Sequence, residues 1–164
     1  MRILEGTERA ERLRVAIVVS RYHAFVTDRL EQGAIEALRA AGVADAHVAI
    51  LRVPGAFEIP LAAKRAADTG AFDAVVCLGC LIRGATPHFD YIASAVAHGL
   101  TDAAAATGVP MAFGVLTTNS AEEALERAAP GPANKGFEAA RAALDMGTLL
   151  EQLRRTPAPP GIAV

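Results

Sequence analysis

Four short apolar runs, each followed by a longer stretch with helical periodicity, constrain the fold of this chain more than any other feature. The apolar runs are 14–20, 47–53, 74–82 and 109–116, and the helical stretches are 27–41, 57–69, 87–107, 121–129 and 135–153. Continuous apolar runs are typical of strands that are buried on both faces of a parallel sheet. Strands that alternate with helices of about ten or more residues predict an α/β fold with helices on both faces of that sheet.

Glycines and prolines mark where these elements end. Gly42, Gly70 and Gly108 follow the first three helical stretches, as expected of helix C-terminal caps. A Pro-Gly-Pro segment at 130–132 divides the last helical region in two. Because no internal repeat or second-domain boundary is found, we expect one domain over 1–164, with an N-terminal arm at 1–12 and a mobile tail at 155–164.

Composition narrows the classes of function. Of the 164 residues 52% are hydrophobic, yet no apolar run reaches the roughly 18 residues of a membrane span. The first six residues lack the apolar stretch of a signal peptide, so we expect a cytoplasmic protein, and the apolar surplus predicts burial between subunits. The net charge of −2, the scattered arginines and the 5% aromatic content argue against a nucleic-acid partner.

Cys77 and Cys80 form a C-x-x-C pattern of the kind found in redox and metal sites. They lie within the apolar run 74–82, and residues three apart on a strand point to opposite faces. We therefore expect two small buried residues that share neither a metal nor a disulfide. The sequence holds no metal-ligand cluster, P-loop or dinucleotide fingerprint, and it predicts no cofactor.

Open parallel sheets bind ligands beyond the carboxyl ends of their strands, which directs attention to the residues after each apolar run. After the third run, Thr86 is expected to cap a helix that begins at Pro87. The free amides from Gly84 onward, with the helix dipole, form either a phosphate cradle or simply a well-capped helix. His88 in the first turn is placed to move protons, although a lone histidine more often has a structural role.

The other strand ends carry further candidates. After the second run, Glu58 either complements a helix dipole or joins the amides of residues 56–58 in binding a polar heterocycle, and Phe57 could equally be a core residue. After the first run, Tyr22 offers a stacking surface for a planar ligand, and His23 lies at the same rim. After the fourth run, a capping box at Ser120 and Glu123 begins a helix. Further on, two basic side chains are either phosphate or carbonyl ligands or solvated charges: Arg127 and Lys135.

Taken together, these segments resemble the lumazine synthase family. The resemblance rests on Val-Pro-Gly-Ala-Phe-Glu-Ile-Pro at 53–60, Leu-Gly at 78–79, Ile-Arg-Gly-Ala-Thr at 82–86, His88, and Asn-Lys-Gly at 134–136. It implies a three-layer flavodoxin-like domain with strand order 2-1-3-4, assembled as a homopentamer and in some members as an icosahedral shell of pentamers. It also implies a cofactor-independent transferase of riboflavin biosynthesis. That enzyme condenses 5-amino-6-(D-ribitylamino)uracil with 3,4-dihydroxy-2-butanone 4-phosphate to 6,7-dimethyl-8-ribityllumazine, phosphate and water.

The resemblance also implies roles for particular residues. Tyr22 would stack on the pyrimidine, and His88 would transfer protons. The uracil and its ribityl chain would be contacted by Ala56, Phe57, Glu58, Cys80, Leu81 and Ile82. The phosphate would be bound by the amides of Ala85 and Thr86 and by Arg127 of a neighbouring subunit, which also supplies Phe113, while Lys135 would lie near the uracil. Three positions depart from the family pattern. Cys80 stands where many relatives carry threonine, Tyr22 replaces a phenylalanine or tryptophan, and Gly131 falls where some relatives carry lysine.

Two other classes of function stay open. The first is a binding protein that holds a flavin or lumazine without turnover, and the second is a mainly structural shell subunit. The presence of both His88 and Arg127 favours the enzyme. The break at 130–132 lacks an insertion that some pentameric relatives carry, which favours a shell, unless its two prolines set a different helix angle.

Overall fold

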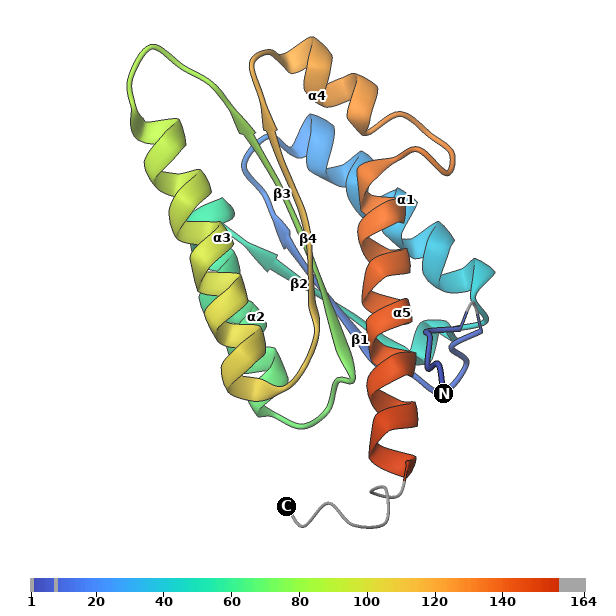
Figure 1. Cartoon of the computed structure of the whole chain (residues 1–164). Coiled ribbons are helices and arrows are strands. Elements are labelled where there is room, and N and C mark those ends of the chain that lie inside the picture. The colour runs from blue at the N-terminus through green and yellow to red at the C-terminus, as the bar shows by residue number, and fades with distance from the viewer. Residues whose placement is uncertain (1, 8, 157–164) are drawn as a thin grey trace.

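A four-stranded parallel sheet runs through the centre of the structure, a computed structural model that describes residues 2–7 and 9–156 (Figure 1). Its strands are β1 Val15–Ser20, β2 Val48–Val53, β3 Ala74–Ile82 and β4 Met111–Thr118. They pair in the order β2-β1-β3-β4, and Val15 lies opposite Val48 on one side and Ala74 on the other. The predicted order 2-1-3-4 and the flavodoxin-like arrangement are confirmed.

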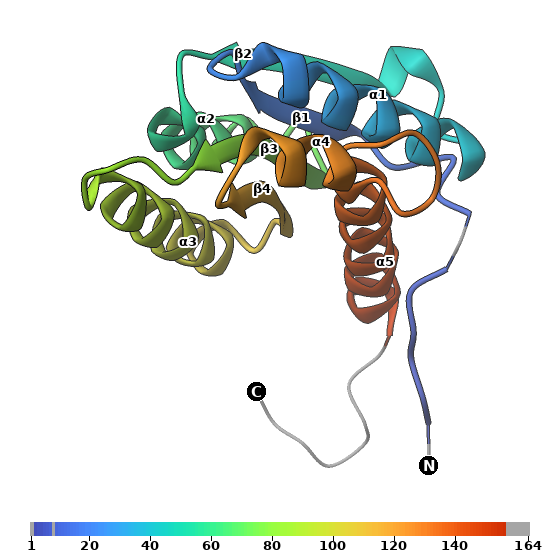
Figure 2. The same ribbon diagram turned by 90° about the horizontal axis from the view of Figure 1, so that it is seen from above.

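Two pairs of helices cover the two faces of the sheet, and the predicted three layers are confirmed (Figures 1 and 2). On one face lie α1 Ala24–Ala40 and α5 Lys135–Arg155, and on the other lie α2 Ile59–Asp68 and α3 His88–Thr107. The short α4 Ala121–Arg127 follows β4, and 3-10 turns precede β2 and α2 at Asp45–His47 and Ala56–Glu58. In the described ranges no helix is both long enough and apolar enough to cross a membrane.

Alternation along the strands divides the core into two clusters. In β1, Ile17 packs toward α1 and α5, whereas Val18 packs toward α2 and α3. The same alternation places Cys80 in the first cluster and Cys77 in the second, both as free thiols, which confirms that the two residues are buried on opposite faces of the sheet. Burial raises the pKa of Cys80 to about 11 and that of Cys77 further, so neither is a thiolate at neutral pH.

The helices α1, α2 and α3 end at the predicted glycines, but several other boundaries of helices and strands differ from the prediction. Gly42, Gly70 and Gly108 have φ values of 83°, 68° and 68°, the left-handed conformation expected of C-terminal caps. The fourth strand was expected at 109–116 but spans 111–118, because Pro110 has no N–H to donate and Met111 to Thr118 pair with Val75 to Ile82 of β3.

The helix starts differ for local reasons. The first helix begins at Ala24 instead of residue 27, because the carbonyl of His23 already accepts hydrogen bonds from the amides of Val26 and Thr27. The stretch expected as a helix over 57–69 begins as a 3-10 turn and becomes α2 only at Ile59. In the last region, α4 ends at 127 instead of 129, and α5 continues two residues beyond the predicted end at 153.

The described part of the N-terminal arm lies against the C-terminal half of α5. Gln152 Nε2 donates to the carbonyl of Glu5 at 2.7 Å, and the amide of Thr7 donates to Thr148 Oγ1 at 2.9 Å. Of the tail predicted at 155–164, Arg155 ends α5, and residues 157–164 lie outside the described residues.

Candidate active site

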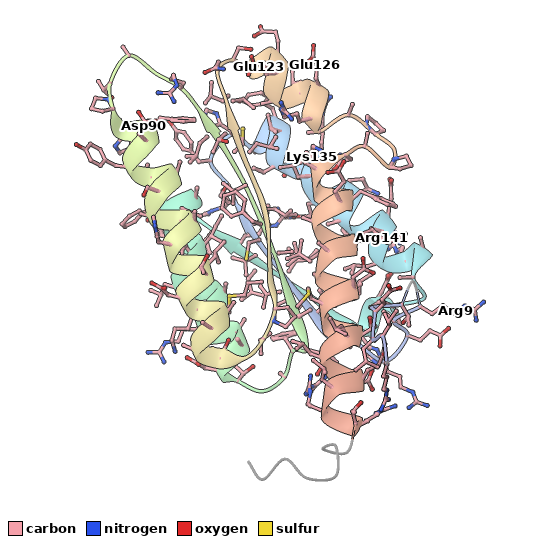
Figure 3. The ribbon with its side chains drawn as sticks, in the orientation of Figure 1. Arg9, Asp90, Glu123, Glu126, Lys135 and Arg141 are labelled. Carbon is pink, nitrogen blue, oxygen red and sulfur yellow. The ribbon has the colours of Figure 1, made fainter. Side chains whose placement is uncertain are left out.

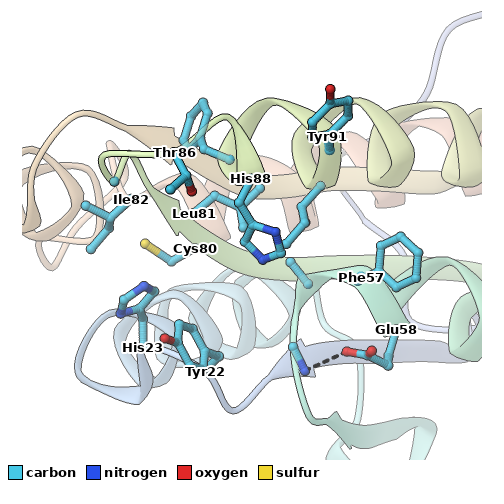
Figure 4. A pocket seen from close by; sticks show the side chains of 15 residues that line it. Tyr22, His23, Phe57, Glu58, Cys80, Leu81, Ile82, Thr86, His88 and Tyr91 are labelled. Carbon is cyan, nitrogen blue, oxygen red and sulfur yellow. Dashed lines mark hydrogen bonds between the residues drawn. The ribbon is translucent and has the colours of Figure 1, made fainter.

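A cavity of about 850 Å³ opens beyond the carboxyl ends of β1, β2 and β3, as Figure 4 shows. Because all strands run in parallel, these ends meet at one edge of the sheet, and a binding site was expected there. A volume of this size suits a small organic ligand. The residues that line the cavity are Tyr22, His23, Gly55, Ala56, Phe57, Glu58, Cys80, Leu81, Ile82, Gly84, Thr86, His88, Phe89, Tyr91 and Ile92.

Most of the predicted site residues lie in the wall of this one cavity. They are Tyr22, Ala56, Phe57, Glu58, Cys80, Leu81, Ile82, Thr86 and His88. Ala85 belongs to the same loop, between Gly84 and Thr86, but does not line the cavity itself. The structure therefore brings together residues that are up to 66 positions apart in the sequence, from Tyr22 to His88.

The three remaining predicted residues lie in a different place. Phe113, Arg127 and Lys135 line a second hollow of about 490 Å³, formed by β4, the end of α4 and the start of α5. This hollow shares no residue with the first cavity. Figure 3 shows the separation, because Asp90 at the start of α3 and Lys135 at the start of α5 lie on opposite sides of β4. Within one chain, the predicted set thus divides into two groups.

An ion pair closes the loop that follows β3. The two terminal guanidinium nitrogens of Arg83, Nη1 and Nη2, donate to the carboxylate of Asp90 at 3.1 and 3.0 Å, and the guanidinium lies 4.3 Å from the centre of the Phe89 ring. The amide of Arg83 also donates to the carbonyl of Thr118 at 2.9 Å. These contacts hold both ends of the four-residue segment that precedes His88.

The predicted capping of α3 by Thr86 is wrong. The helix begins at His88, and Pro87 is the N-cap, since its carbonyl accepts hydrogen bonds from the amides of Asp90 and Tyr91. Thr86 therefore lies one residue too early to cap the first turn, and no side-chain cap bond is formed. Thr86 instead lines the cavity wall.

The loop after β2 is held by Glu58. One carboxylate oxygen of Glu58 accepts a hydrogen bond from the amide of Gly55 at 2.9 Å, and this contact is drawn in Figure 4. Within the described residues the other oxygen has no hydrogen-bond partner, and Glu58 lines the cavity. Phe57 is 61% exposed, so the alternative that it is a core residue is wrong.

The predicted capping box on α4 forms in a shifted register. Ser120 Oγ accepts from the amide of Glu123 as expected, but the Glu123 carboxylate accepts from the amide of Asn119 instead of that of Ser120.

Sequence reasoning missed several cavity residues. Tyr91 and Ile92 follow His88 by three and four positions, so helical periodicity could have placed them on the same face of α3. His23 was noted only as lying at the rim, although its ring lines the cavity. No sequence signal marks Phe89, which contacts Arg83 through its ring.

The fold and the cavity define a flavodoxin-like α/β protein with a cavity of small-molecule size at the carboxyl edge of its sheet. Comparison with known proteins narrows that class. The sequence model of the family described as 6,7-dimethyl-8-ribityllumazine synthase matches residues 12–151. A 6,7-dimethyl-8-ribityllumazine synthase of Desulfatibacillum aliphaticivorans is 45% identical over 153 residues, which cover 93% of this chain and 99% of that protein. The chain belongs to the 6,7-dimethyl-8-ribityllumazine synthase family, and both hollows lie within the matched residues.

Proposed function

We propose that this chain is a transferase that forms 6,7-dimethyl-8-ribityllumazine in the penultimate step of riboflavin biosynthesis. Its substrates are 5-amino-6-(D-ribitylamino)uracil and 3,4-dihydroxy-2-butanone 4-phosphate. Family membership supports this reaction. The structural observation that carries the proposal is the convergence of Tyr22, Glu58, Thr86 and His88 on one cavity at the carboxyl edge of the sheet.

The uracil substrate occupies the part of the cavity beside Tyr22. The Tyr22 ring is 66% exposed, which leaves a face free to stack on a pyrimidine. The segments at 56–58 and 80–82 contact the uracil and its ribityl chain, and Glu58 has an unpaired carboxylate oxygen available for an N–H or hydroxyl donor. Because Cys80 has no hydroxyl, its contact is made by the backbone.

The phosphate of the second substrate binds at the start of α3. The amides of Ala85 and Thr86 and the positive end of the helix dipole favour an anion there. The Arg83–Asp90 ion pair keeps this loop in one conformation before the substrate arrives.

His88 accepts and returns protons during the condensation. The uracil's amine attacks the ketone, and loss of water gives a Schiff base. Removal of a proton from carbon then allows phosphate to leave, and the second amine closes the ring with loss of a second water. Holding the two substrates in register supplies a large part of the rate, and no step needs a cofactor.

A complete site requires two copies of the chain. The described residues that line the cavity include no lysine or arginine, although the substrate carries a phosphate. Arg127 and Lys135 lie in the second hollow, with Phe113 47% exposed beside them. We propose that this hollow faces the cavity of the next subunit in a homopentamer that works in the cytoplasm. The exposed rings of Phe57 and Tyr91 at the cavity rim support burial between subunits. We propose in addition that these pentamers assemble into an icosahedral shell.

The reaction is tested by mixing the purified protein with both substrates and following lumazine fluorescence together with phosphate release. Equimolar formation of the two products is expected. A preparation that forms neither product but binds riboflavin tightly would refute the enzyme and support the second candidate, a flavin- or lumazine-binding protein that uses the same cavity.

The shared site is tested by complementation between two inactive variants. His88→Ala damages the cavity side, and Arg127→Ala damages the side supplied by the neighbour. In a random one-to-one co-assembly, about a quarter of the sites combine an intact His88 with an intact neighbouring Arg127, so about a quarter of the wild-type activity returns. Absence of any recovery in verified mixed oligomers contradicts the shared site.

Arg127→Ala alone also separates the roles of the two substrates. Loss of a charged hydrogen bond to phosphate is expected to raise the KM for the phosphate substrate about 10- to 100-fold. The KM for the uracil substrate should change little. Arg9→Ala is the matched control, because the side chain of Arg9 is 88% exposed on the N-terminal arm (Figure 3). Equal effects of Arg127→Ala on both KM values contradict its assignment to the phosphate.

A further inference from the structure

His23 gives the cavity a second imidazole, to which the family resemblance assigns no role. It lies three residues after the end of β1, and its ring lines the cavity together with that of His88. Figure 4 shows the two rings entering from opposite sides, His23 from the end of β1 and His88 from the start of α3. Both imidazoles therefore face the space that the substrates occupy.

The backbone of His23 adopts a conformation that is rare for any residue other than glycine. With φ 60° and ψ 46° it is left-handed, and it is the one non-glycine residue with positive φ in the described part of the chain. The residue is the N-cap of α1, but its side chain makes no cap hydrogen bond. The side chain is thus directed to the cavity and does not serve the helix that it precedes.

Aromatic contacts hold the ring and leave its nitrogens unused. The ring packs edge-to-face against Tyr22, with 4.6 Å between ring centres, and against Phe25, with 5.8 Å. Neither ring nitrogen has a hydrogen-bond partner among residues 2–7 and 9–156. Burial lowers the pKa of His23, which favours the neutral imidazole with one donor and one acceptor nitrogen.

We propose that His23 contacts the uracil substrate directly and hydrogen-bonds one of its hydroxyl or amine groups. The inference rests on the proposed function of the cavity, in which the pyrimidine stacks on Tyr22. A ring stacked on Tyr22 lies within reach of the neighbouring His23 ring, because the two side chains are already in contact. The uracil substrate offers both donors and acceptors in its ribityl chain and amines, which a neutral imidazole can match.

The experiment compares steady-state kinetics and melting temperatures of His23→Gly, His23→Asn and Tyr22→Ala. His23→Gly removes the ring and suits the left-handed backbone, so the melting temperature is unchanged or higher. Loss of the hydrogen bond raises the KM for the uracil substrate about 5- to 50-fold, while the KM for the phosphate substrate changes less than about twofold. His23→Asn, which also tolerates this backbone and keeps a donor and an acceptor, recovers part of the loss.

The outcomes separate this inference from the proposed function. An unchanged uracil KM in His23→Gly, with a raised KM in Tyr22→Ala, overturns the role of His23 and leaves the site in place. Unchanged KM values in both variants overturn the assignment of the cavity itself. Equal losses in His23→Gly and His23→Asn, with lowered melting temperatures in both, mean a structural role and also overturn the inference.

Discussion

Asn134 joins three segments of the chain around the second hollow, and its removal is the most informative test of stability. The side chain is 1% exposed. Its Nδ2 donates to the carbonyls of Arg29 on α1, at 3.1 Å, and of Ala128 at the end of α4, at 2.9 Å. Its Oδ1 accepts from the amides of Gly136 and Phe137 at 2.8 and 3.2 Å, which makes it the N-cap of α5. We expect this residue to hold the α4–α5 connection against α1.

The destabilisation by Asn134→Ala follows from the groups that lose a partner. Loss of the N-cap bonds costs about 1–2 kcal/mol. The carbonyl of Ala128 loses its hydrogen bond in a buried setting, which costs about a further 1–3 kcal/mol. Arg29 lies within α1, and its carbonyl keeps a helical bond, so it adds little. The expected decrease in the free energy of unfolding is therefore about 2–5 kcal/mol.

Gly33 on α1 provides the second arm of a double-mutant cycle. A Cβ added at Gly33 would lie 2.5 Å from Asn134 Cγ, so Gly33→Ala in the wild-type protein is expected to destabilise by about 1–3 kcal/mol. In the Asn134→Ala background that obstacle is gone, and alanine's helix propensity makes the same substitution neutral or stabilising by up to about 1 kcal/mol. The coupling free energy between the two positions is about 2 kcal/mol.

Equilibrium urea unfolding of the four proteins, at one protein concentration, measures this coupling. Gly70→Ala is the matched control, because Gly70 has a positive φ and its added Cβ meets nothing within 4 Å. Its effect is expected to add to that of Asn134→Ala within about 0.5 kcal/mol. Additivity between Gly33→Ala and Asn134→Ala to the same limit would refute the contact on which this reasoning depends.

Three other features give predictions of their own. Arg83→Ala removes the ion pair that closes the loop after β3, at which we propose that the phosphate binds. This substitution should raise the KM for the phosphate substrate about 3- to 30-fold but change the melting temperature little, because the pair is exposed. An unchanged KM argues against the loop's role. Cys80 lines the cavity and Cys77 does not, so a maleimide at pH 8 should label Cys80 slowly, and bound lumazine should slow this labelling further. Labelling of Cys77 should require unfolding. Mass spectrometry of peptides identifies which cysteine is labelled. Burial opposes ionisation of Asp73, but hydrogen bonds from Arg14 outweigh burial and lower the pKa of Asp73. The Asp73 carboxylate therefore stabilises the folded state above a pH of about 4, and this stabilisation is lost as the pH falls. The melting temperature of Asp73→Asn should accordingly fall less than that of the wild type between about pH 5 and pH 3, and parallel curves contradict this.

The layers and strand order could be predicted because they depend on patterns that extend over many residues. The run at 74–82 is apolar throughout and short, as is typical of a strand buried on both faces, and β3 spans the predicted residues. The placement of Cys77 and Cys80 follows from the same period of two. The starts of α1 and α3 depend instead on the backbone conformations of His23 and Pro87, for which single residues carry almost no signal.

The site was predictable where it lies on strand ends and less so where it depends on the start of a helix. Tyr22, Glu58 and Thr86 follow three different strands, and parallel pairing alone brings them to one edge. Tyr91 was missed, although it follows His88 by three positions in a stretch expected to be helical and so lies on the same face. The ion pair of Arg83 with Asp90 depends on where α3 begins, since Asp90 lies in its first turn, and the sequence placed that start one residue too early.

The placement of charge has a consequence for assembly. Among the described residues that line the cavity, Glu58 is the one aspartate, glutamate, lysine or arginine, and in the proposed enzyme Arg127 and Lys135 of the neighbouring subunit supply the cations. A phosphate bound at the start of α3 would then be held by both copies of the chain. A ligand that binds the assembled interface more tightly than it binds the separated subunits stabilises the interface by the difference between the two binding free energies. Inorganic phosphate should therefore shift subunit dissociation to lower protein concentration, and Arg127→Ala should abolish the shift. An equal shift in that variant would mean that the cation for the phosphate lies within the same chain as the cavity.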